Sequence, residues 1–164
     1  MTSEQTDGSP SCEIALRQYM ASLQQALTDF QFIEEGLRLC IGTSYALIKI
    51  KTAGNPPFNM SPEDIAKDAL GRLLHRYAQV SDNKTLVDNL RKLLPRRNWC
   101  AHQGLLLTTE QQKDVAWLDL ERTKLEKLHA DAKEYVVELM HEWDSLQKKV
   151  GMSSNNPVDR SRAR

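Results

Sequence analysis

Apolar residues recur along most of this chain at intervals of three and four, the spacing of one helix face. The longest series lies between Pro10 and Lys51, with small or apolar residues at positions 16, 20, 23, 27, 30, 33, 37, 41, 45 and 48. Ser9 suits the cap of this helix, and Pro10 suits its first position. The pattern therefore predicts one long first helix. Because that length is unusual in a small domain, it allows a kink near Thr28–Asp29 or Gly36.

Prolines and glycine mark the next elements. The stretch 52–59, with Gly and two Pro residues, predicts a loop, and Ser61 followed by Pro62 predicts the start of a second helix. Its expected buried stripe is Ile65, Ala69, Leu73 and Tyr77. A third helix carries the stripe Leu86, Leu90, Leu93 and Leu94. Pro95 is expected to end or bend that helix, because proline lacks the backbone N–H and crowds the preceding turn.

Thr108 and Gln111 have the spacing of a capping box and predict the start of the last helix. We expect it to run from about Glu110 to Val150. Its stripe is Val115, Leu118, Leu125, Leu128, Ala132, Tyr135, Leu139, Trp143 and Leu146. No segment alternates apolar and polar residues as a strand would. The sequence predicts an all-α fold, a four-helix bundle with two long and two shorter helices.

The 164 residues suit one domain with its own core. We assign residues 1–11 to a disordered tail, 12–150 to the helical domain and 151–164 to a disordered basic tail, which is either a solvated terminus or a weak RNA tether. The first residues lack the basic and apolar regions of a signal peptide. Three cysteines without a Cys-x-x-Cys motif indicate neither disulfides nor zinc, which fits a reducing cytoplasm.

Charge changes this picture only locally. Lys and Arg number 22, as do Asp and Glu, so nucleic acid would have to bind to a local patch rather than to the whole surface. Such a patch lies between residues 91 and 97, which include four basic residues and no acidic one, whereas the last helix is net acidic. A helix end with solvated charges is the plain interpretation of this run.

The basic run leads into Arg97-Asn98-x-x-x-His102. On a helix, Asn98 and His102 share a face, whereas Arg97 is about 140° from His102 and reaches it if the turn after Pro95 is irregular. An amide can orient an imidazole, a guanidinium can hold a phosphate through two hydrogen bonds, and an imidazole can transfer a proton. These groups suffice for RNA transesterification. Alternatively, His102 merely closes a helix turn and Arg97 pairs with an acid.

The run Leu93–Gly104 resembles the signature of the HEPN superfamily: an Arg, a polar residue that is often Asn, then His, with a small Ala before it and a Gly after it. Trp99 is bulkier than the aliphatic residue typical there. The order of helices is similar over about residues 12–150, although only the motif is specific.

The resemblance implies a dimeric four-helix bundle, with the motifs of both copies facing a shared cleft. Many such proteins are metal-independent endoribonucleases of toxin–antitoxin and defence systems, which use the ribose 2′-hydroxyl as nucleophile. It implies that Arg97 clamps the phosphate, Asn98 is its polar neighbour and His102 transfers the proton. The implied partners are RNA, a second copy and an antitoxin such as a nucleotidyltransferase, without cofactor or metal. The residues expected to bind RNA are Arg91, Lys92, Arg96 and Trp99, the last being a core residue or a base-stacking platform.

Two other functions stay open: a non-catalytic helical module that binds RNA, a nucleotide or a protein, and a structural helical dimer. The remaining histidines are interpreted as surface or boundary residues. His129 and His141 are about 18 Å apart along a helix, which excludes a shared metal, and His75 has no partner at metal spacing. Glu34–Glu35 is interpreted as a solvated pair.

Overall fold

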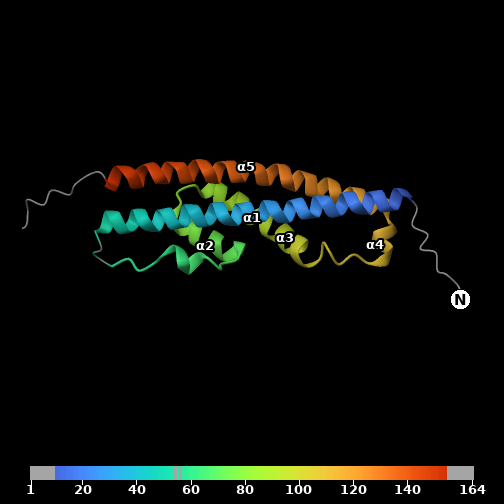
Figure 1. Cartoon of the computed structure of the whole chain (residues 1–164), viewed down its shortest axis with the longest axis horizontal. Coiled ribbons are helices and arrows are strands. Elements are labelled where there is room, and N and C mark those ends of the chain that lie inside the picture. Colours follow the sequence, from blue (N-terminus) through green and yellow to red (C-terminus); the bar gives the residue numbers. More distant parts are fainter. Residues whose placement is uncertain (1–9, 54, 56, 155–164) are drawn as a thin grey trace, which may run out of the picture. The chain divides into compact units, whose positions relative to one another are not determined.

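The computed structural model describes residues 10–53, 55 and 57–154, and every regular element among them is helical. The all-α prediction is confirmed. The elements are α1 (Pro10–Thr52), a 3₁₀ turn η1 (Pro62–Ile65), α2 (Leu70–Val80), α3 (Lys84–His102), α4 (Thr109–Lys113) and α5 (Val115–Ser154) (Figure 1). The described residues thus form five α-helices rather than the four expected. The predicted tails lie outside the described residues at 1–9 and 155–164, but 10–11 and 151–154 are helical.

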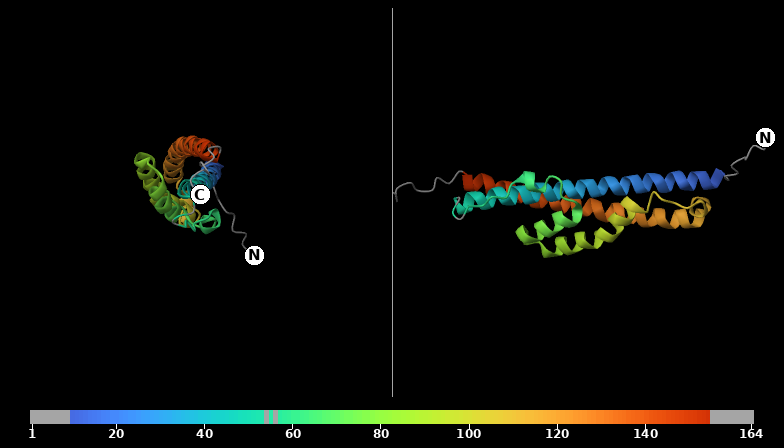
Figure 2. Two further views of the ribbon diagram at one scale, coloured as in Figure 1. Left: turned by 90° about the vertical axis from the view of Figure 1, so that its left-hand side faces the viewer. Right: turned by 90° about the horizontal axis from the view of Figure 1, so that it is seen from below.

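The chain forms two compact units. Among the described residues, unit 1 comprises 10–31 and 95–133, and unit 2 comprises 32–94 and 134–154. Helices α1 and α5 lie side by side and run in the same direction within each unit (Figures 1 and 2). In unit 1 the Arg122 guanidinium donates to Gln18 Oε1 over 3.2 Å. In unit 2 the Trp143 indole donates to Thr43 Oγ1 over 3.1 Å.

Unit 2 has its core where α1, α2, α3 and α5 meet. The fully buried side chains include Ile33, Leu37, Ile41, Leu70, Leu73, Leu74, Leu86, Leu90 and Leu139. Removal of this apolar surface from water is the main contribution to folding. Gly36 lets α5 come close to α1, because a Cβ added there would lie 3.2 Å from Leu139 Cδ1. Beyond the core, α1 ends where Ala53 takes a left-handed φ of 48°.

Unit 1 has its core between the first half of α1, the end of α3 and the first half of α5. Its buried apolar side chains are Ala15, Tyr19, Leu23, Ala26, Phe30, Cys100, Leu118, Leu125, Leu128 and Ala132. The predicted stripe is wrong by one residue at the start of α1, where Met20 is exposed and Leu16 is half-buried. Tyr19 takes the inward position because its hydroxyl has a hydrogen-bond acceptor inside the unit.

The predicted second helix is wrong as a single element. Its first turn is η1, for which Ser61 N donates to Asp64 Oδ2 over 2.7 Å. The chain then breaks, and Ala69 is the exposed N-terminal cap of α2 rather than a buried stripe position. The break places the buried carboxylate of Asp68 against two arginines, 3.2 Å from Arg72 and 2.7 Å from Arg76.

Pro95 does not end the third helix, because α3 continues to His102. The cost of the missing N–H is offset by burial on both sides of the proline, since Leu93 and Cys100 are both buried. The predicted last helix is also divided. The Thr108–Gln111 capping box is confirmed, but it opens α4, and α5 begins anew after Asp114. Asp114 Oδ1 accepts a hydrogen bond from Trp117 N over 3.0 Å, as an N-cap residue does.

Candidate active site at the end of α3

The predicted motif occupies the last two turns of α3, in unit 1. Asn98 and His102 are both exposed, and their spacing of four places them on one face of the helix. Arg97 is half-buried. Because the helix continues through Pro95, no irregular turn brings Arg97 round to His102, and the two residues lie about 140° apart around the axis. His102 and Asn98 therefore present one polar face of the helix. The Arg97 guanidinium can reach that face only if its side chain extends around the helix.

Arg96 is held by two contacts within unit 1. Its Nη2 donates to Glu121 Oε2 over 2.7 Å, and its guanidinium carbon lies 4.0 Å from the centre of the Trp99 ring. Lys124 Nζ donates to the other oxygen, Glu121 Oε1, also over 2.7 Å. Arg96 thus anchors α3 to α5. Trp99 is half-buried beneath it, which is neither a fully buried core position nor an open stacking platform.

The carboxylate of Glu121 is the buried centre of this cluster. Burial alone would raise its pKa, but the hydrogen bonds from Lys124 and Arg96 outweigh burial and hold the pKa below the ordinary value. Glu121 therefore stays ionised as the acceptor of both cations. Removing either partner of such a pair destabilises the fold, because the remaining charge is then left without its partner.

The turn after His102 is fixed from the opposite side by α1. Gln103 N and Gly104 N both donate to Trp99 O, over 2.8 and 2.9 Å. Tyr19 donates to Gly104 O over 2.7 Å. A Cβ at Gly104 would lie only 2.8 Å from Leu23 Cδ1. The absence of a side chain at Gly104 therefore allows the close approach of α1 at this turn.

Burial raises the pKa of Tyr19 to about 12, with the nearby charge of Glu121 adding to the effect. Tyr19 is accordingly a neutral donor at any pH near neutrality. Burial also raises the pKa of Cys100, which packs in the core below the motif. A buried thiol with a raised pKa is a poor nucleophile. Cys100 therefore contributes packing rather than chemistry to this site.

The two other predicted RNA contacts, Arg91 and Lys92, lie on the part of α3 that belongs to unit 2. Both are exposed. Arg91 lies 3.4 Å from Asp88, and Lys92 donates to Asn89 over 3.1 Å. Each pair is three residues apart along the same helix, an arrangement that leaves long side chains largely solvated. Their role in RNA binding stays a prediction.

One pair, between a histidine and an aspartate, was not predicted from the sequence. His129 Nδ1 lies 2.7 Å from Asp29 Oδ2, and Gln25 Nε2 donates to Asp29 Oδ1 over 3.0 Å. Asp29 is only 5% exposed, so a buried carboxylate orients the imidazole of a boundary residue. A hundred residues separate the partners, and the only signal in the sequence is an acid next to the apolar stripe of α1.

The remaining candidates are ordinary. His75 lies 3.3 Å from Gln79 on α2, and His141 is exposed on α5. Glu34 and Glu35 both pair with Arg38, at 3.4 and 3.5 Å. Within the ranges 10–53 and 57–154, no group of three or more His, Cys, Asp or Glu is arranged to hold a metal ion. In the same ranges, no helix combines the length and the apolar character needed to cross a membrane.

Comparison with known proteins adds no relative: no family model, no curated protein and no solved structure matches this chain.

Proposed function

We propose that this chain is a HEPN-like, metal-independent endoribonuclease in which His102 transfers the proton and Arg97 holds the scissile phosphate. The observation that carries the proposal is the exposed pair of Asn98 and His102, one turn apart at the end of α3. An imidazole with a neighbouring amide on an open face has access to a polymeric substrate, which a buried histidine would lack.

The proposed reaction is an internal transesterification. A neutral imidazole of His102 accepts the proton of a ribose 2′-hydroxyl as that oxygen attacks the adjacent phosphorus. The bond from phosphorus to the 5′-oxygen breaks, and this oxygen takes up a proton as it leaves. The products are a cyclic phosphate and a 5′-hydroxyl. Arg97 supplies a planar cation for the charge on the phosphoryl oxygens, and Asn98 orients the imidazole.

The surroundings of His102 support a positioned residue rather than a frayed helix end. The preceding turn is tied to α5 through Arg96 and Glu121, and the following turn is tied to α1 through Tyr19 and Gly104. Catalytic groups need such support, because a small displacement from the productive geometry lowers the reaction rate strongly. The exposed imidazole therefore lies between two fixed points of unit 1.

We propose further that the active form is a twofold homodimer that buries the segment next to the motif. Leu105 and Leu106, which directly follow Gly104, are 55% and 76% exposed. Adjacent exposed leucines are typical of a surface that another chain covers. A second copy would bring a second Arg97 and His102, so that one imidazole can accept the proton while the other donates to the leaving oxygen.

Cleavage of a single-stranded RNA in excess EDTA tests this function. We expect His102→Ala to reduce the rate by about 10²–10⁴-fold, the usual contribution of a proton-transfer group. Arg97→Lys should also reduce it strongly, since a point charge does not reproduce the planar fork, whereas Asn98→Ala should be milder. His141→Ala is the matched control, because this histidine is also exposed and lies on the other unit. Equal loss in His102→Ala and His141→Ala would contradict the proposal.

A non-catalytic RNA-binding module is the second candidate. The observation that favours it is the angular separation of Arg97 from His102 on an uninterrupted helix, which weakens their cooperation within one copy. In that case the wild-type protein would bind RNA without cleaving it, and His102→Ala would keep its affinity. Arg97→Ala would then weaken binding and reduce its dependence on salt.

A further inference from the structure

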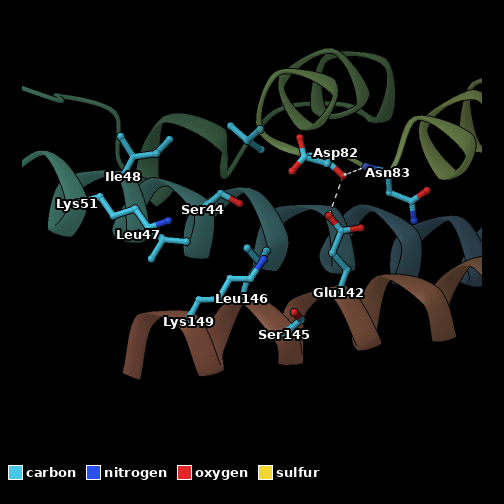
Figure 3. Close-up of a pocket in the computed structure, with 12 residues that line it drawn as sticks. Ser44, Leu47, Ile48, Lys51, Asp82, Asn83, Glu142, Ser145, Leu146 and Lys149 are labelled. Carbon is cyan, nitrogen blue, oxygen red and sulfur yellow. Dashed lines mark hydrogen bonds between the residues drawn. The ribbon is translucent and has the colours of Figure 1, made fainter. Parts of the chain in front are cut away.

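Unit 2 contains a pocket of about 400 Å³ that has no part in the proposed cleavage reaction. It lies between the end of α1, the α2–α3 connection and the last third of α5 (Figure 3). Pockets of this size hold small organic molecules in other proteins. Its polar lining residues are Ser44, Lys51, Ser81, Asp82, Asn83, Glu142, Ser145 and Lys149.

Several of these polar groups have no partner within the fold. Ser44 is only 6% exposed, yet within the described part of the chain no hydrogen bond joins its hydroxyl to another residue. The same holds for the side chains of Lys51, Asp82, Ser145 and Lys149, none of which has a hydrogen bond or ion pair with a described residue. Lys51, Asp82, Ser145 and Lys149 are exposed, and the Ser44 hydroxyl is not fully enclosed, so these groups are open to solvent and to a ligand that enters the pocket.

Glu142 gives the pocket a fixed acceptor. Ser81 Oγ donates to Glu142 Oε1 over 2.7 Å, and the Tyr77 hydroxyl donates to Glu142 Oε2. Burial raises the pKa of Tyr77, and the hydrogen bond to Glu142 adds to this, so the phenol remains a donor. Each carboxylate oxygen keeps a further lone pair for a donor that enters the pocket. The carboxylate is therefore held in one orientation without being saturated.

Charge is separated across the pocket. Figure 3 shows Lys51 and Lys149, from α1 and α5, on one side and Asp82 with Glu142 on the other. Leu47, Ile48 and Leu146 add an apolar wall beside the lysines. A simple anion would satisfy only the ammonium groups, and a simple cation only the carboxylates.

We infer that this pocket binds a small zwitterionic molecule. Its anionic group, a carboxylate or a phosphate, would lie between Lys51 and Lys149. Its ammonium group would donate to Asp82 and Glu142, and the carbon chain between them would contact the apolar wall. The Ser44 hydroxyl, on the α1 side of the pocket, would contribute a further hydrogen bond. The inference does not depend on RNA cleavage, because none of these residues belongs to the proposed active site.

Thermal unfolding and calorimetric titration of the full chain test the inference with four probes. Phosphoethanolamine and 6-aminohexanoate carry both charges and differ in the anion, whereas inorganic phosphate and putrescine carry one kind of charge each. We expect one of the zwitterions to raise the unfolding midpoint by about 2–4 °C at saturation and to bind at least tenfold more tightly than either single-charge probe. Failure of both zwitterions, or equal binding of inorganic phosphate, would overturn the inference.

Substitutions locate the binding. Lys51→Met with Lys149→Met should weaken the zwitterion at least tenfold, and Ser44→Ala should weaken it while leaving the fold intact, because alanine fits where serine does. Lys148→Met is the matched control, since Lys148 is an exposed neighbour on α5 outside the pocket lining. Unchanged affinity in both Ser44→Ala and the double lysine variant, or equal loss in Lys148→Met, would place the binding elsewhere and refute this site.

Discussion

The phenolic hydroxyl of Tyr19 donates a 2.7 Å hydrogen bond to the carbonyl oxygen of Gly104, two residues beyond His102. Tyr19 is fully buried, and its ring lies 5.8 Å from that of Trp117 on α5. One side chain of α1 therefore connects the turn that follows the candidate catalytic histidine to the core of unit 1. The position of His102 depends on this contact as well as on α3 itself.

Tyr19→Phe should test that dependence, because it deletes the hydroxyl and keeps the ring. It leaves the Gly104 carbonyl without its donor, so we expect a loss of about 1–3 kcal/mol in the free energy of unfolding in urea. RNA cleavage should fall less than in His102→Ala, since no reacting group is removed. A Tyr19→Phe protein as stable as the wild type would show that the contact contributes nothing.

The buried carboxylate of Glu121 should make the free energy of unfolding depend on pH. Its pKa in the folded state is below the ordinary value of 4.5, so the folded protein gains stability from its ionised form at higher pH. This contribution is present above pH 4.5 and is lost as pH falls through the folded pKa. Glu121→Gln should lower stability at pH 7 by about 1.5–3 kcal/mol, the range for hydrogen bonds to charged groups. The free energy of unfolding of this variant should also fall less than that of the wild type as the pH is lowered.

Urea unfolding at a series of pH values between 7 and 3 measures this effect. Glu126→Gln serves as the control, because Glu126 is exposed and lies 3.9 Å from the Arg122 guanidinium. Parallel pH curves for the wild type and Glu121→Gln would show that the Arg96–Glu121 pair does not carry the predicted linkage.

The three thiols should react at different rates. Burial raises the pKa of Cys40 from 9.0 to about 12 and also raises that of Cys100, whereas Cys12 is half-buried near the start of α1. Because the thiolate is the reactive form, Cys12 should react with Ellman's reagent first at pH 8. We expect one fast equivalent in the folded protein and three after unfolding. Cys12→Ser should remove the fast phase, and a fast phase that persists in this variant would contradict the burial of Cys40 and Cys100.

The proposed dimer predicts a solution mass of about twice the 18.7 kDa of the chain. Light scattering at micromolar concentration should show this mass for the wild type. Replacing both exposed leucines, Leu105→Ser with Leu106→Ser, should shift the mass toward the monomer without unfolding the protein, because neither side chain is buried. Ile14→Ser, an exposed apolar residue on α1, is the control. A wild-type monomer would refute the dimer.

Much of the fold could be predicted from local patterns. The Thr108–Gln111 capping box depends on neighbouring residues and is confirmed. Helix α1 is helical from Pro10, the first described residue, and its predicted Ser9 cap lies outside the described residues. Three features were missed: the break before α2, the passage of α3 through Pro95, and the restart of α5 after Asp114. At the first and third, an aspartate that is paired or caps a helix interrupts a continuous apolar stripe. At the second, the helix continues although the proline favours a break.

The sequence likewise predicts one part of the candidate site, the motif, but not the contacts that support it. The motif could be found because its residues are contiguous, and a spacing of four predicts that Asn98 and His102 share a face. Its supports could not, because Tyr19–Gly104 and Arg96–Glu121 join residues 85 and 25 positions apart. The pairing of Arg96 with Glu121 could not be predicted, because the burial of Glu121 is not visible in a net acidic helix.

Cleavage of paired RNA substrates tests the central claim most directly. One oligonucleotide is all ribose, and the other has a 2′-deoxy sugar at the position where the first is cut. In excess EDTA, the wild-type protein should convert the first into a fragment with a 2′,3′-cyclic phosphate and leave the second intact at that position, while His102→Ala cuts neither at a comparable rate. Cleavage that EDTA abolishes, that ignores the missing 2′-hydroxyl, or that persists in His102→Ala would contradict the assignment of this chemistry to the end of α3.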